Sequence, residues 1–169
     1  MKRQQGFTLI ELIIVIVVLG ILAVTAAPQF INFSSDARAS TVKGAQASIQ
    51  GAMQLVYARS LVNGTEGTSP SSVTTEGGAV TTSYGYPTAD AAGIAVAAGL
   101  NANDWTQVDG TGAAAAEATP AGGAVGFHPA GVTPDFTVTA ETGDSCHVLY
   151  TAAVDEDNAA TVSAVTGGC

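Results

Sequence analysis

Residues 7–27 read FTLIELIIVIVVLGILAVTAA, and this apolar stretch decides how the rest of the chain is interpreted. Thr8, Glu11 and Thr25 are its polar members. An α-helix rises about 1.5 Å per residue, so a helix of this length extends about 30 Å, the thickness of the hydrocarbon core of a bilayer. We therefore predict a hydrophobic transmembrane helix over residues 7–30.

The residues before this stretch, MKRQQG, are polar and basic. Lys2 and Arg3 lie on the N-terminal side of the predicted helix, and positively charged flanks stay on the cytoplasmic side of a membrane. The sequence therefore predicts a cytoplasmic N-terminus, with the remainder of the chain exported.

Three fates of the apolar stretch agree with that orientation. It is a permanent anchor, or a secretory signal peptide cut after residues 24–26, or it stays in the mature protein because the cut falls between Gly6 and Phe7. Pro28 makes the site at residues 24–26 a poor one, and Glu11 interrupts the apolar region that a signal peptide needs. The residues around the third site favour that fate.

Gly6 and Phe7, the glutamate at position 11 and the run LIIVIVVLGILA after it closely resemble the N-terminus of type IV prepilins. The resemblance covers roughly the first third of the chain. It implies that a prepilin peptidase removes residues 1–6 and that Phe7 becomes N-methylated. Pro28 matches the proline that interrupts the pilin helix, so a kink or a melted stretch is expected there.

The resemblance also implies a fold. It is α+β, with a long N-terminal helix, hydrophobic in its first half, packed on a small antiparallel β-sheet, and with a C-terminal region closed by a disulfide.

Placing a carboxylate inside a bilayer costs about 3 kcal/mol of free energy, so we expect Glu11 to have a function there. One interpretation is that Glu11 is protonated or reaches the lipid headgroups. We favour another, in which Glu11 pairs with the α-amino group that cleavage creates on Phe7 of a neighbouring subunit. Such a pair sets the register of neighbouring helices more than it adds stability.

Residues 31–63 continue the helix in amphipathic form. Apolar side chains recur at spacings of three and four, which is typical of a helix with one buried face. Asn63 and Gly64 are predicted to end the helix. The stripe consists of Val42, Ala45, Ile49, Ala52, Met53, Val56 and Tyr57.

Residues 64–131 are rich in Gly, Ala, Thr and Ser and have poor periodicity. They predict loops, short helices and one or two strands, with a short helix within residues 89–100 packed against the long helix. We interpret Trp105 as a core residue, and His128 and His147 as structural histidines, because neither has a second His or Cys at metal-binding spacing.

Residues 132–169 predict a β-meander. β-branched runs at 136–140, 146–150 and 161–165 are separated by polar turns. Cys146 and Cys169 are the two cysteines of the chain, so a single connectivity is possible in an exported domain. A bridge between them would tie down the C-terminus, and it is also the arrangement of the pilin D-region.

Charge and motifs exclude several classes of function. Twelve of the fourteen carboxylates follow Arg59, and no Lys or Arg does, so nucleic-acid binding is not expected. Residues 155–157, Asp-Glu-Asp, lack the spacing of an EF-hand loop, and we interpret them as a solvated turn rather than a calcium site. Neither a phosphate loop nor a nucleophile beside a base is present, so we expect no enzyme activity, no cofactor and no metal.

The resemblance to prepilins implies that the chain is the major subunit of a type IV pilus, a helical homopolymer used for attachment to cells and surfaces. The expected partners are further copies of the chain, prepilin peptidase and the pilus assembly machinery of the inner membrane, with host glycans or abiotic surfaces outside the cell. The precursor would span the inner membrane once, with its C-terminus in the periplasm, and the assembled subunit would lie in a surface pilus.

Residues 29–33, the Ala-rich helix and residues 126–131 most resemble the mannose-sensitive haemagglutinin (MSHA) pilins, which implies attachment and biofilm formation. The alternatives are a pseudopilin of a type II secretion system, a minor pilin that acts as an adhesin, and a secreted acidic domain. Pseudopilins of that kind usually lack the disulfide and are built around a calcium loop.

Overall fold

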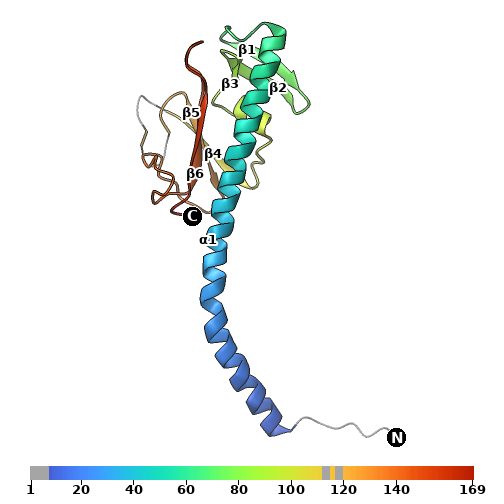
Figure 1. Cartoon of the computed structure of the whole chain (residues 1–169), viewed down its shortest axis with the longest axis vertical. Coiled ribbons are helices and arrows are strands. Elements are labelled where there is room, and N and C mark those ends of the chain that lie inside the picture. The colour runs from blue at the N-terminus through green and yellow to red at the C-terminus, as the bar shows by residue number, and fades with distance from the viewer. Residues whose placement is uncertain (1–7, 112–114, 117–119) are drawn as a thin grey trace, which may run out of the picture. The chain divides into compact units, whose positions relative to one another are not determined.

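The computed structural model describes residues 8–111, 115–116 and 120–169, without the side chains of residues 26–32. The chain divides into two compact units, residues 1–37 and 38–169. Helix α1, Leu9–Asn63, passes through both (Figure 1). The two parts of α1 differ in chemistry, because residues 12–24 in the first unit are almost entirely apolar whereas the part in the second unit is amphipathic.

The predicted amphipathic stripe forms the helical half of the core of residues 38–169. Val42, Ala45, Ile49, Ala52 and Val56 are 8% exposed or less, and Met53 packs partly buried beside them. Their spacing of three and four places them on one side of the helix, where they meet the sheets. The prediction of this stripe is confirmed.

A three-stranded antiparallel sheet follows α1 in sequence. Its strands are β1 (Ser71–Thr75), β2 (Gly78–Ser83) and β3 (Tyr86–Pro87), in the order β1-β2-β3. The buried Ser60 hydroxyl of α1 donates to the carbonyl oxygen of Gly85 at 3.0 Å, which ties the helix to the β2–β3 turn. Gly85 has φ of +80°, and a Cβ there would lie 2.9 Å from the ring of Tyr57, so this position requires glycine.

Helix α2, Ile94–Ala98, lies within the predicted helical range 89–100 and ends at Gly99 in the left-handed conformation. Ile94 is fully buried. The Ser48 hydroxyl of α1 donates to the Ala98 carbonyl at 3.1 Å, which joins the two helices directly. The expected packing of a short helix against the long one is confirmed.

The second sheet has four antiparallel strands in the order β4-β5-β6-β7. The pairing is that of a meander, because each strand lies beside the next in sequence. Its core-facing side chains include Val125, Phe127, Val148 and Tyr150, each 1% exposed or less. The strands are β4 (Trp105–Asp109), β5 (Ala124–Pro129), β6 (His147–Thr151) and β7 (Thr161–Val165).

The strand predicted at residues 136–140 is wrong. Asp135 instead begins a turn, because its carboxylate accepts hydrogen bonds from the backbone N–H of Thr137 at 2.9 Å and from its hydroxyl at 2.6 Å. Local bonds of this kind compete with sheet pairing. Phe136 is 1% exposed and packs over Gly126, where a Cβ would lie 2.1 Å from the ring.

The described part of residues 64–131 contains five strands, more than the one or two expected, since β1 to β5 all lie there. The expected α+β class is confirmed, with a long N-terminal helix, antiparallel sheets and a C-terminal disulfide. The described residues form two sheets, where a single one was expected.

Candidate functional site

The start of α1 carries a capping box formed by Thr8 and Glu11. The Thr8 backbone N–H donates to Glu11 Oε2 at 2.8 Å, and the Glu11 backbone N–H donates to Thr8 Oγ1 at 3.3 Å. The Thr8 hydroxyl also donates to Glu11 Oε2, at 2.7 Å. These reciprocal bonds satisfy backbone donors that a helix N-terminus leaves without intrahelical acceptors. The sequence Thr-x-x-Glu is the known signature of such a box, and the sequence analysis overlooked it.

The segment of α1 that follows is apolar all round and uncovered. Every large hydrophobic side chain between Leu9 and Val24 is 46% to 76% exposed. Leu, Ile and Val make up this surface, and a continuous apolar surface is characteristic of a segment that packs against a partner. By length and hydropathy taken together, no helix among the described residues meets the requirements for crossing a membrane.

Several predicted site residues lie where the structure gives no test. Gly6, Phe7 and the predicted leader at residues 1–6 fall outside the described residues. At Pro28 the helix assignment of α1 is continuous, and the expected kink stays a prediction.

At the other end of the chain, Cys146 and Cys169 form the predicted disulfide. Backbone bonds reinforce it, since Gly168 N–H donates to the Ser145 carbonyl at 2.9 Å and Thr166 N–H donates to the Glu141 carbonyl at 2.8 Å. The C-terminus is therefore held to the segment that precedes β6.

His147 lies beside this disulfide and is 1% exposed. Its Nδ1 is 2.9 Å from the Ser145 hydroxyl, and its ring packs edge-on to Phe136 with centroids 4.7 Å apart. Burial lowers the pKa of His147 from 6.5 to about 4, against the opposing effect of the Asp135 carboxylate. The structural role expected of this histidine agrees with these contacts.

Trp105 and His128 also take the structural positions expected of them. Trp105 packs partly buried against the core, and His128 is 8% exposed with Nδ1 3.1 Å from the Pro129 carbonyl oxygen. Within the described residues no group of three or more His, Cys, Asp or Glu side chains is arranged to hold a metal ion.

The acidic turn between β6 and β7 is organised by its own side chains. Asp155 Oδ1 accepts hydrogen bonds from the backbone N–H groups of Asp157 at 2.9 Å and Asn158 at 2.8 Å. The Asn158 side chain also donates to it, and these bonds lower the pKa of the Asp155 carboxyl. The Asp155 carboxylate therefore holds the turn together.

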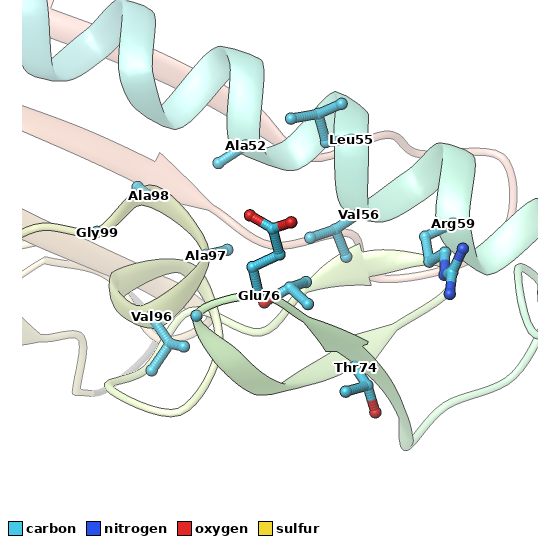
Figure 2. Close-up of a pocket in the computed structure, with 12 residues that line it drawn as sticks. Ala52, Leu55, Val56, Arg59, Thr74, Glu76, Val96, Ala97, Ala98 and Gly99 are labelled. Atoms are coloured by element: carbon cyan, nitrogen blue, oxygen red, sulfur yellow. The ribbon is translucent and has the colours of Figure 1, made fainter.

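A groove of about 830 Å³ lies between α1, the β1–β2 turn and α2. Figure 2 shows Ala52, Leu55 and Val56 of α1 on one side of it and residues of α2 on the other. Glu76 directs its carboxylate toward α1, and Arg59 lies toward the other end. The sequence analysis did not identify this groove, because its walls come from three separate segments.

Comparison with known proteins places the similarity at the N-terminus. The prokaryotic N-terminal methylation motif matches residues 1–27. The chain is 44% identical over 50 residues to the type IV narrow pilus major component PilA5 of Thermus thermophilus, a match that covers 30% of this chain and 43% of that protein.

Two further relatives represent different assemblies. The type IV major fimbrial protein FimA of Dichelobacter nodosus is 42% identical over 64 residues, which is 38% of each chain. The type II secretion system core protein G of Pseudomonas aeruginosa is 39% identical over 54 residues, 32% of this chain and 38% of that protein. The chain thus spans less than half the length of these relatives, and no solved structure matches it significantly.

Proposed function

We propose that this chain is the precursor of the major structural subunit of a type IV pilus. One observation carries the proposal: the methylation motif at residues 1–27 includes the first turns of α1, where every large apolar side chain from Leu9 to Val24 is exposed. The similarity to named pilus components over this region supports the same conclusion.

The proposed first step is cleavage between Gly6 and Phe7 by prepilin peptidase, followed by N-methylation of Phe7. The capping box supports a cut at this place. Its donors and acceptors all belong to Thr8 and Glu11, so removal of residues 1–6 leaves the start of α1 capped.

In the next step Glu11 pairs with the α-amino group of Phe7 on a neighbouring subunit. An ionised carboxylate offers about four acceptor positions, and the two bonds from Thr8 both go to Oε2. The carboxylate can therefore cap its own helix and accept a bond from an ammonium group of another chain. A pair of opposite charges in apolar surroundings fixes register, because any sliding of the helices leaves both charges buried without a partner.

The apolar segment supplies the driving force for assembly. Before assembly, the inner membrane and its assembly machinery hold the precursor. In the filament, the same side chains between Leu9 and Val24 pack against those of other copies, and the helix bundle replaces lipid as their surroundings.

A second candidate function is that of a pseudopilin, which the similarity to the type II secretion protein favours. The Cys146–Cys169 disulfide and the self-contained Asp155 turn support the pilus instead, because the resemblance assigns pseudopilins a calcium loop and usually no disulfide. Attachment to cells and surfaces, as in the MSHA pilins, is the finer proposal for the assembled filament.

The experiment is electron microscopy of the producing cells, with intact-mass analysis of filaments sheared from them. We expect abundant filaments made of a chain that begins at N-methylated Phe7. Filaments absent from the surface but present on overproduction of a secretion system would support the pseudopilin. A chain that begins near Ala27 would contradict both candidates, because the helix would then be a signal peptide.

A further inference from the structure

The last turns of α1 carry an exposed stripe of Leu55, Arg59 and Val62, which we call the α1 stripe. Leu55 is 74% exposed and Val62 is 78% exposed. Spacings of four and three place the three side chains on one face of the helix. The stripe therefore presents a cation between two large aliphatic side chains.

Within the described residues, no ion pair neutralises the charge of Arg59. In the described part of residues 38–169, Lys43 pairs with Glu141 at 2.9 Å, whereas Arg59 takes part in no ion pair. Glu76 lines the same groove as Arg59, but its carboxylate points toward α1 beside Ala52 and Val56, away from Arg59 (Figure 2). Arg59 is thus available to an anion from another molecule.

The β6–β7 turn has the complementary chemistry. Val154 is 67% exposed. Among the described residues that follow α1, it is the one large hydrophobic residue that is exposed. The carboxylates of Glu156 and Asp157 follow it on exposed residues. Asp155 holds the backbone of the turn through bonds to Asp157 and Asn158, so the Asp157 carboxylate is presented in a preorganised arrangement, and the Glu156 side chain lies beside Gly67 of the same chain.

We infer that the β6–β7 turn of one copy docks on the α1 stripe of the next copy. Val154 packs against Leu55 and Val62, and the carboxylates of Glu156 and Asp157 lie opposite Arg59. This inference rests on the proposed function, since it names a contact between subunits of the filament. The partner is a second copy of this chain, because the chain carries both complementary surfaces: an apolar and acidic turn, and an apolar and basic stripe.

The contact joins two different patches, so it is heterologous and leaves one turn and one stripe open at the two ends of every assembly. Heterologous contacts that do not close into a ring extend into helical filaments. Glu76 adds selectivity, because its carboxylate repels the acidic turn from the floor of the groove and leaves the Arg59 end as the favourable one.

The first test reverses charges in the full-length chain in producing cells. Arg59→Glu and the double variant Glu156→Lys/Asp157→Lys should each lower the amount of sheared filaments about tenfold, because like charges then face one another at every repeat. Combining all three substitutions should restore most of the filaments. Matched controls are Arg38→Glu for the single variant and Asp104→Lys/Asp144→Lys for the double variant. They reverse the same number of charges on exposed residues elsewhere and should leave the amount unchanged.

The comparison of filament amounts between the single-side variants and the combined variant decides whether the contact exists. Immunoblots of the membrane fraction show whether each variant is produced, and non-reducing gels show whether its disulfide is intact. Filaments at the wild-type level from the single-side variants, or failure of the combined variant to recover, would overturn the inference. Neither result affects the proposed function, which fails only if the unaltered chain forms no filaments.

A second measurement does not depend on the effect of charge. A photoreactive amino acid at position 154 in assembled filaments should form a dimer adduct that maps to residues 55–62 of another copy. Adducts confined to other segments would contradict the contact even if the charge variants behave as expected.

Discussion

The hydroxyl of Tyr150 on β6 donates a hydrogen bond of 2.7 Å to the carbonyl oxygen of Pro87 on β3, and this bond joins the two sheets. Tyr150 is fully buried, and burial raises the pKa of its phenol above the ordinary value. The bond spans 63 positions of sequence, so it is a purely tertiary contact.

Removing this hydroxyl should destabilise the protein. In Tyr150→Phe the Pro87 carbonyl loses its buried donor while the ring still packs, so the free energy of unfolding should fall by about 1–3 kcal/mol. Urea unfolding of the detergent-solubilised chain, followed by Trp105 fluorescence, measures the change. Tyr84→Phe, at the β2–β3 turn, is the matched control and should shift the midpoint little; equal effects of the two substitutions would contradict the role given to Tyr150.

The disulfide should contribute through the unfolded state. It closes a loop with a sequence separation of 23, so reduction, or the double substitution Cys146→Ala/Cys169→Ala, should lower the free energy of unfolding by about 3 kcal/mol. Unfolding with and without reductant tests this directly. The double variant should not respond to reductant, and a response there would mean that reductant acts elsewhere.

His147 should make stability depend on pH. Its pKa is lowered from 6.5 to about 4 in the folded state, first because of burial, so between these values the unfolded chain binds more protons than the folded one. Stability is therefore complete above pH 6.5 and is lost as the pH falls toward 4, by an amount of about 3 kcal/mol.

The measurement is urea unfolding at several pH values for the wild type and for His147→Asn, which keeps an acceptor near Ser145. The variant should lose most of the pH dependence across this range. His128→Asn is the control and should retain it. An unchanged slope in His147→Asn would assign the effect to other groups.

Substitutions of Glu11 can separate its two roles. Glu11→Gln keeps an acceptor for the capping box, since Gln serves at this position, but it removes the charge that the Phe7 amine requires. We expect this variant to be inserted and cleaved yet to form no filaments, as with Glu11→Ala. Thr8→Ala removes the threonine hydroxyl but keeps the carboxylate, and it should form filaments.

Counts of filaments by microscopy, with the mature mass as a check of cleavage, decide between these roles. Normal filaments from Glu11→Gln would show that Glu11 acts through the helix cap alone.

Local signals in the sequence predicted the helical part of this protein well. The stripe from Val42 to Val56 repeats within single turns of a helix, so its pattern needs no knowledge of distant residues. The pairing of Cys146 with Cys169 followed from there being two cysteines. The Thr8–Glu11 box was equally local and could have been predicted from its spacing.

What the tertiary structure decided depends on residues that meet across long separations. Strands β1 to β5 come from a Gly-, Ala- and Thr-rich region whose side chains carry weak local preferences, so their pairing was set by the partners they meet. At residues 136–140 the β-branched pattern did not produce a strand, because the Asp135 turn and the packing of Phe136 over Gly126 fix a different backbone conformation. The sequence by itself determined the motif, the helix and the disulfide, because these rest on local spacing or on composition. Tertiary structure alone determined the two-sheet arrangement, the burial of His147 and the surfaces left exposed on α1, because each depends on which distant side chains cover which face.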